Sequence, residues 1–163
     1  LHLAELRGGT GIVEARDLTD EKAERIRENT RRSQLQNICV VCRDATVPDE
    51  ESFDKADVVL ADLPCSGLGV LNKKHDLKYR MTPAQQGELV QLQRQILDAS
   101  WRYVKPGGTL LYSTCTVHRE ENEGNVEWIL AHYPFILEEQ KKTLPGIDPW
   151  DGFFIAKFKR KTG

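Results

Sequence analysis

The chain has 163 residues, of which 39% are hydrophobic and 29% are charged, and its formal net charge is -2. This composition is typical of one globular domain with a real core, and it excludes fibrous and low-complexity proteins. No apolar run reaches the about 18 residues that cross a membrane, and the opening LHLAELRGG does not resemble a signal peptide. Four cysteines in a chain of this length do not indicate a disulfide framework. We therefore expect a cytoplasmic protein with reduced thiols, and the slightly acidic balance argues mildly against a dedicated nucleic-acid binder.

Strands and helices are predicted to alternate along the chain. The predicted helices cover residues 1–7, a segment that starts at the cap Thr19, residues 82–104 and residues 120–132. The predicted strands cover residues 11–18, 38–45, 56–63, 109–116, 135–139 and 153–159. Gly8 and Gly9 end the first helix, and Lys105 to Gly108 are expected to end the third. The near-continuous apolar run of residues 56–63 predicts a strand that is buried on both faces.

This alternation predicts an α/β fold with a mostly parallel sheet and helices on both faces. The last two strands lie close together in sequence, so we expect them to be antiparallel neighbours. A capping box at Thr82 and Gln85, with Pro83 at the first helical position, predicts the start of the longest helix. No linker interrupts the pattern, and a single domain over residues 1–163 is the prediction.

Two short segments place a cysteine directly after an apolar run. Cys65 lies in ADLPCSGLG, residues 61–69, and Cys115 lies in LLYSTCT, residues 110–116. In an open α/β sheet the active crevice lies outside the carboxyl ends of the parallel strands. We therefore expect the two thiols to meet in one crevice, beside the carboxylate of Asp62.

A thiol pair beside an acid suits covalent chemistry on an electron-poor ring such as cytosine. A thiolate that adds to carbon 6 turns carbon 5 into a nucleophile, which can take a methyl group from a sulfonium donor. A free thiol is only a few per cent ionised at pH 7, so the site should favour the thiolate. Asp62 could hydrogen-bond the edge of the base if its surroundings keep it protonated.

The two cysteine motifs belong to a longer pattern. DLPCSGLG, HDLKY at residues 75–79 and STCTVHREEN at residues 113–122 together resemble the RNA cytosine-5 methyltransferases. The closest branch is that of the bacterial Fmu/Sun-type 16S rRNA enzymes, and the resemblance covers nearly the whole chain. It implies a Rossmann-like class I methyltransferase domain, S-adenosylmethionine as cofactor and ribosomal RNA as partner.

The resemblance also implies roles for individual residues. Cys115 matches the nucleophile that attacks carbon 6, and Cys65 matches the cysteine that helps the product to leave and is a candidate base. Asp62 matches the acid at the junction of cofactor and cytosine. Asp17 would then hold the ribose hydroxyls of the cofactor and Asp44 its adenine amino group.

A basic cluster follows the first cysteine motif, and its Lys78 is the candidate substrate-binding residue. The other clusters of lysines and arginines are expected to be solvated faces.

The sequence departs from the family pattern at its beginning. The glycine-rich cofactor motif and the strand before it are absent from these 163 residues, so we expect a sheet without its first, central strand. Such a sheet would expose two strand edges. We therefore expect weak cofactor binding by the chain alone, unless a second copy or the missing segment completes the sheet by association.

Three alternatives stay open. In DNA cytosine-5 methyltransferases the nucleophile is the cysteine of the Pro-Cys motif, which would be Cys65. Amino-methylating enzymes are disfavoured, because they carry a Pro-Pro-aromatic motif where this chain has Leu63-Pro64-Cys65. The chain could also be a catalytically incomplete fragment that binds RNA or a partner. No metal site is expected, and the C-x-x-C of Cys39 and Cys42 is better explained by core packing.

Overall fold

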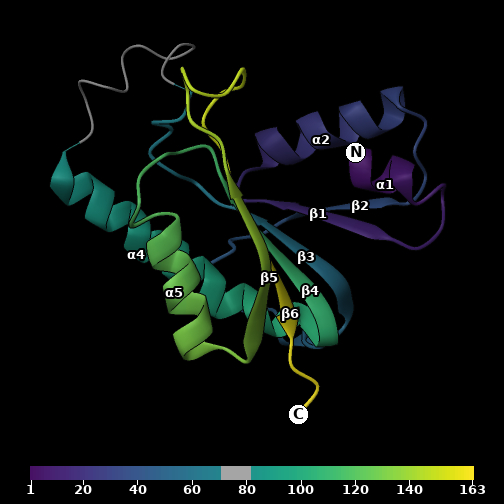
Figure 1. Cartoon of the computed structure of the whole chain (residues 1–163). Helices are drawn as coiled ribbons and strands as arrows, with labels where there is room; N and C mark the ends of the chain where they lie inside the picture. Colours follow the sequence, from purple (N-terminus) through teal and green to yellow (C-terminus); the bar gives the residue numbers. More distant parts are fainter. Residues whose placement is uncertain (71–81) are drawn as a thin grey trace. The chain divides into compact units, whose positions relative to one another are not determined.

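The computed structural model describes residues 1–70 and 82–163 (Figure 1). Its helices are α1 (His2–Leu6), α2 (Asp20–Arg32), α4 (Pro83–Ser100) and α5 (Glu123–His132), with short 3-10 helices η1 (Glu50–Ser52) and η2 (Trp101–Tyr103). Its strands are β1 (Val13–Asp17), β2 (Ile38–Cys42), β3 (Ala56–Asp62), β4 (Val104–Thr114), β5 (Phe135–Lys142) and β6 (Phe154–Arg160). The chain divides into two compact units, Leu1–Val47 and Pro48–Gly163, and each is described by itself. The expectation of a single domain stays a prediction.

The first unit is a parallel pair of strands with helices. β1 and β2 pair from Val13 opposite Ile38 to Asp17 opposite Cys42. The predicted cap of α2 is confirmed, because the Thr19 hydroxyl accepts a hydrogen bond from the Lys22 N–H at 3.4 Å.

The predicted end of the first helix is also confirmed. Gly8 and Gly9 follow α1 with φ of +56° and +79°, a backbone conformation that glycine adopts at little cost. The prediction for Cys39 and Cys42 is wrong, however, since both side chains are exposed and do not pack in a core.

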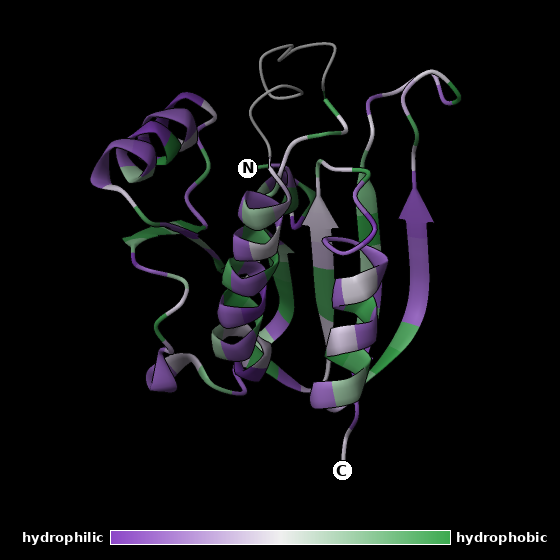
Figure 2. Ribbon diagram, turned by 90° about the vertical axis from the view of Figure 1, so that its left-hand side faces the viewer, coloured by the Kyte–Doolittle hydropathy of each residue, from purple (hydrophilic) through white to green (hydrophobic). Residues whose placement is uncertain are grey.

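The second unit is built on a four-stranded sheet in the order β3-β4-β6-β5. β3 and β4 are parallel, and β6 is antiparallel to both β4 and β5, so only β6 runs against the others. Helices α4 and α5 lie side by side over one face of this sheet (Figures 1 and 2). The core lies between these layers, and its largest fully buried apolar side chains are Tyr112, Phe154, Phe158, Leu97, Leu110 and Ile129. The predicted α/β class, the mostly parallel sheet and the antiparallel pairing of the last two strands are confirmed.

The longest helix starts as predicted and ends earlier. At the start of α4 the Thr82 hydroxyl accepts from the Gln85 N–H at 3.3 Å, and the Gln85 side chain accepts from the Thr82 N–H at 2.9 Å. The helix ends at Ser100 and not near residue 104, because Trp101 to Tyr103 form the tighter η2. Among the described residues, no helix is long and apolar enough to cross a membrane.

β3 and β4 differ from their predicted forms. β4 begins at Val104, before the Pro-Gly-Gly segment that was expected to precede the strand, and the pairing shifts register between Ala56 and Val58. β3 is an edge strand of this sheet, and its side chains Val58 and Leu60 are 50% and 48% exposed. The prediction that this strand is buried on both faces is therefore wrong for the described residues.

Candidate functional site

The carboxyl ends of β3 and β4 bring the two cysteines of the second unit together. The strands are parallel and in register, with Asp62 opposite Ser113, and each cysteine follows its strand within three residues. The Sγ atoms of Cys65 and Cys115 are 3.1 Å apart, and the Cys115 N–H donates to Cys65 Sγ at 3.3 Å. Both side chains are half-buried. The predicted meeting of the two thiols is confirmed.

Burial keeps Cys65 protonated. Burial, followed by the contact with Cys115, raises the pKa of Cys65 from 9.0 to about 12. Cys65 is therefore a thiol at neutral pH, and either sulfur can donate in the contact between Cys65 and Cys115.

A buried carboxylate, Glu121, lies behind the two cysteine-bearing turns. Its Oε1 accepts from the Ser66 hydroxyl at 2.5 Å, and its Oε2 accepts from the Ser66 N–H at 2.9 Å. The Gln93 side chain of α4 also donates to Oε2 at 3.0 Å, and the same amide group donates to the Pro64 carbonyl at 2.9 Å. Ser66, Gln93 and Glu121 are all at most 1% exposed. The turn around Cys65 is thus held in place by a cluster of buried polar side chains.

The same cluster reaches the turn around Cys115. The Thr116 hydroxyl lies 2.8 Å from that of Ser66, and the Thr116 carbonyl accepts from the Asn122 side chain at 2.9 Å. Asn122 in turn accepts from the Thr114 hydroxyl at 2.6 Å. The residues on both sides of Cys115 are therefore held by buried hydrogen bonds.

Two further buried side chains extend the cluster into the core. Asn125 donates to Gln93 Oε1 at 2.7 Å and to the Tyr112 hydroxyl at 3.0 Å, and Tyr112 donates to the backbone carbonyl of Glu121. Burial raises the pKa of Tyr112 well above its ordinary value, so this hydroxyl stays protonated and can donate. Buried polar networks of this kind rigidify a structure when every member has a partner.

Two glycines allow a second loop to approach the first cysteine motif. The Gly152 N–H donates to the Gly69 carbonyl at 2.8 Å, and the Gly69 N–H donates to the Cys115 carbonyl at 3.1 Å. A Cβ atom on Gly69 would overlap the Gly152 carbonyl oxygen and would lie 2.8 Å from the Cys115 carbonyl oxygen. Glycine is therefore required at position 69 by backbone atoms, which cannot move aside as a flexible side chain can.

Asp62 lies at the last position of β3, where its side chain is exposed. Its Oδ1 accepts a hydrogen bond from the Ser113 hydroxyl at 2.9 Å, across the register pair of β3 and β4. This contact fixes the carboxylate at the same edge of the sheet as the two cysteines.

The other two predicted acids lie together in the first unit. Asp17 ends β1, and Asp44 comes two residues after β2, at the same edge of the parallel pair. Asp17 Oδ1 accepts from the Leu18 N–H at 2.8 Å. Asp44 Oδ1 accepts from the Thr46 N–H and hydroxyl at 2.8 and 2.7 Å, and these bonds lower the pKa of Asp44. Two oriented carboxylates at one strand edge fit a ligand with hydroxyl and amino donors.

The candidate substrate residue Lys78 lies outside the described residues, which omit 71–81. Among the described residues, no group of three or more histidines, cysteines, aspartates or glutamates could hold a metal ion. Ser66, Thr116 and Glu121 lie inside the sequence motifs, but the sequence alone predicts no role for them. The signal that could have found them is polar side chains at fixed positions beside two cysteines that must meet.

The family model described as 16S rRNA methyltransferase RsmB/F matches residues 1–159. Ribosomal RNA small subunit methyltransferase B of Sodalis glossinidius (strain morsitans) is 37% identical over 170 residues, which cover 99% of this chain and 39% of that protein. Ribosomal RNA small subunit methyltransferase F of Cronobacter sakazakii is 30% identical, over 97% of this chain and 37% of that protein. The chain thus spans about two fifths of the length of these curated relatives.

Solved structures of methyltransferases are also similar to this chain. The crystal structure of NSun6 from Pyrococcus horikoshii with SFG is 31% identical and superposes with a TM-score of 0.89, over 99% of this chain and 44% of that one. A methyltransferase homologue from the same organism superposes with a TM-score of 0.85 at 25% identity, over 98% of this chain and 56% of that one. The predicted Rossmann-like methyltransferase fold is confirmed by these likenesses.

Proposed function

Because the chain belongs to the family of 16S rRNA methyltransferases RsmB/F, we propose that it transfers a methyl group to carbon 5 of a cytosine in 16S ribosomal RNA. The observation that carries this proposal is the 3.1 Å contact between the sulfurs of Cys65 and Cys115. A second thiol in contact with the first suits a covalent mechanism with separate steps of attack and release. The names of the curated relatives support ribosomal RNA as the substrate.

Cys115 is the nucleophile in this proposal. Its thiolate forms a bond to carbon 6 of the ring, and the displaced electron pair makes carbon 5 nucleophilic. The protonation of Cys65 supports this assignment, since a thiol with a pKa of about 12 is a poor nucleophile at neutral pH. After methyl transfer, loss of the carbon 5 proton lets the bond between sulfur and carbon 6 break, and the ring becomes aromatic again.

Cys65 acts at the release step. With a pKa of about 12 it enters the reaction as a thiol, so the half-buried Cys65 must first pass its own proton to water before it can take one from carbon 5. A thiolate with so high a pKa is a strong base. We also propose Asp62 as the acid at the junction of cytosine and cofactor, and Lys78 as a substrate-binding residue.

The proposed cofactor is S-adenosylmethionine, which supplies an electrophilic methyl group when it is bound. Asp17 and Asp44 would hold it, through the ribose hydroxyls and the adenine amino group respectively. Their fixed carboxylates at the end of β1 and after β2 fit those donors. The structural relative solved with SFG, an analogue of S-adenosylmethionine, supports this choice.

The test is methyl transfer from labelled S-adenosylmethionine to unmodified 16S rRNA, followed by digestion and identification of the modified nucleoside. The proposal predicts 5-methylcytidine as the product and no product with Cys115→Ala. Labelled N4-methylcytidine, or full activity of Cys115→Ala, would contradict it.

The alternative is a chain that binds RNA or a partner without catalysis. Calorimetric titration with S-adenosylmethionine separates the two, because a purely binding module would take up RNA and no cofactor. Self-association to complete the sheet stays a prediction, and sedimentation of the chain with and without cofactor tests it.

A further inference from the structure

We propose that Glu121 is a positioning residue that couples the two cysteine-bearing turns and sets the distance between their thiols. The catalytic consequence of this coupling rests on the proposed function above, but the coupling itself does not. Neither the family assignment nor the roles inferred from the two cysteine motifs includes it.

The network joins the residues that directly follow the two cysteines. Ser66 directly follows Cys65, and Thr116 directly follows Cys115. Their hydroxyls are 2.8 Å apart, and Ser66 is bound to Glu121 by both its N–H and its hydroxyl. The two motifs are 50 residues apart in sequence, and their side chains meet at this bridge and at the sulfur contact.

The hydrogen bonds of the bridge have a defined direction. Ser66 has one hydroxyl proton, and at 2.5 Å from Glu121 Oε1 it donates that proton to the carboxylate. Ser66 must then accept from Thr116, and Thr116 accepts from the His118 N–H at 3.2 Å. Every bond in this chain points toward Glu121, whose carboxyl oxygens accept at its end.

The carboxylate itself is held in place from several sides. Glu121 is 0% exposed, Gln93 donates to Oε2 at 3.0 Å, and His118 Nδ1 lies 3.4 Å from Oε1. That histidine nitrogen is buried and takes part in no described hydrogen bond. A carboxylate fixed this firmly can fix the groups that bind it.

The consequence is a preset geometry for the reacting sulfurs. The serine and threonine are each adjacent to a cysteine, so a loss of the bridge lets the two turns move apart. A displacement of about 1 Å between reacting groups can cost about 100-fold in rate. Glu121 touches neither sulfur and acts through Ser66 and Thr116.

The direct test is the rate at which diamide links Cys65 to Cys115. Each thiol loses one proton, the pair loses two electrons, and the N=N bond of diamide takes up both protons and both electrons. The sulfurs must close from 3.1 Å to the about 2.0 Å of a disulfide. The exposed Cys39 and Cys42 are replaced by serine in every variant, and mass spectrometry identifies the bond formed.

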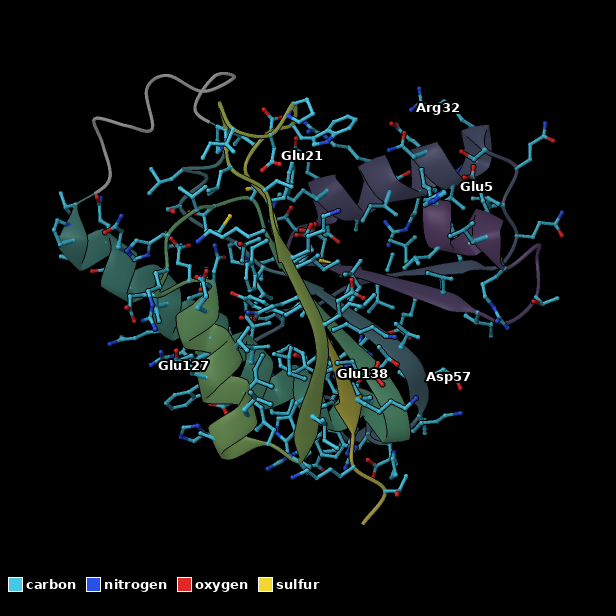
Figure 3. All side chains as sticks on the ribbon, viewed as in Figure 1. Glu5, Glu21, Arg32, Asp57, Glu127 and Glu138 are labelled. Atoms are coloured by element: carbon cyan, nitrogen blue, oxygen red, sulfur yellow. The ribbon has the colours of Figure 1, made fainter. Side chains whose placement is uncertain are left out.

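Two variants cut the bridge with little change in volume, Ser66→Ala and Thr116→Val. We expect each to slow disulfide formation by about tenfold or more, while Thr116→Ser, which keeps the hydroxyl, stays within about twofold of the parent. Glu121→Gln tests the carboxylate itself. If that variant does not fold, the rates of Ser66→Ala and Thr116→Val are sufficient to test the proposal. Glu127→Gln is the matched control, because Glu127 lies exposed on α5 (Figure 3) and pairs with Arg119 at 2.9 Å.

Unchanged disulfide rates in folded Ser66→Ala and Thr116→Val would overturn the proposal. An equal loss in Thr116→Ser and Thr116→Val would also overturn it, because the hydroxyl would then not be the cause. The assay needs neither RNA nor S-adenosylmethionine, so its result is independent of the proposed function. If methyl transfer is observed, Ser66→Ala should lower kcat and leave the KM for RNA unchanged.

Discussion

Gly69 is the position where a single added methyl group most directly tests the close approach of the loops around the thiols. In Gly69→Ala the Cβ atom would overlap the Gly152 carbonyl oxygen and would lie 2.7 Å from the Gly152 carbonyl carbon. Overpacking of this kind costs about 1–3 kcal/mol. The two backbone hydrogen bonds of Gly69 contribute about 0.5–1.5 kcal/mol each. If both are lost, the free energy of unfolding falls by about 2–6 kcal/mol, a large part of the about 5–15 kcal/mol of a small domain.

Urea denaturation followed by tryptophan fluorescence measures this change. Trp101, Trp128 and Trp150 all lie in the second unit, so their signal reports on the unit that carries Gly69. Gly87→Ala is the matched control, because a Cβ atom there has nothing within 4 Å and helix propensity predicts a gain of about 1 kcal/mol. A Gly69→Ala midpoint at or above that of the parent would refute the reasoning from the glycine contact.

Three further predictions concern stability. Thr82→Ala removes the capping box of α4 and should lower the free energy of unfolding by about 1 kcal/mol, whereas Thr82→Ser should keep it in the same urea assay. Tyr112→Phe removes the hydrogen bonds that the Tyr112 hydroxyl makes with the Asn125 amide and the Glu121 carbonyl, which should cost about 1–3 kcal/mol, and an unchanged urea midpoint would count against the buried network. The folded-state pKa of Cys65 lies above its ordinary 9.0, so the folded protein binds this proton more tightly than the unfolded chain does. The stabilisation that this tighter proton binding gives the folded state is complete below pH 9 and is lost as the pH rises toward 12. Cys65→Ser should therefore flatten the free energy of unfolding as a function of pH over this range. An identical pH dependence in Cys65→Ser would contradict the raised pKa of Cys65.

The meeting of the thiols could be predicted because it follows from chain topology. Two parallel neighbouring strands end at the same edge, so residues directly after Asp62 and Thr114 must lie close together. The start of α4 could be predicted for a similar reason, since a capping box is a purely local pattern.

The network behind the thiols could not be predicted from helix periodicity. Gln93 and Asn125 are polar, yet both are fully buried on their helices. The periodicity of apolar residues along a helix predicts burial only for apolar side chains. Their burial depends on partners from other elements, above all on Glu121, and only the tertiary structure brings those partners together.

The errors in β3 and β4 have physical causes as well. A continuous apolar run predicts burial on both faces, but a strand at the edge of its sheet exposes part of that run, as Val58 and Leu60 do. The Pro-Gly-Gly segment, which is typical of a turn before a strand, lies within β4. Glycine suits position 108 because a Cβ atom there would be 2.8 Å from the Lys105 carbonyl oxygen.

Covalent trapping on an RNA that carries 5-fluorocytidine tests the central claim most directly. The reaction is run with S-adenosylmethionine, because the fluorine blocks the loss from carbon 5 that normally releases the enzyme after methyl transfer. The account predicts a complex that survives denaturation with the parent chain and with Cys65→Ala, and none with Cys115→Ala. A complex that persists in Cys115→Ala and is lost in Cys65→Ala would contradict it, because the nucleophile would then be Cys65.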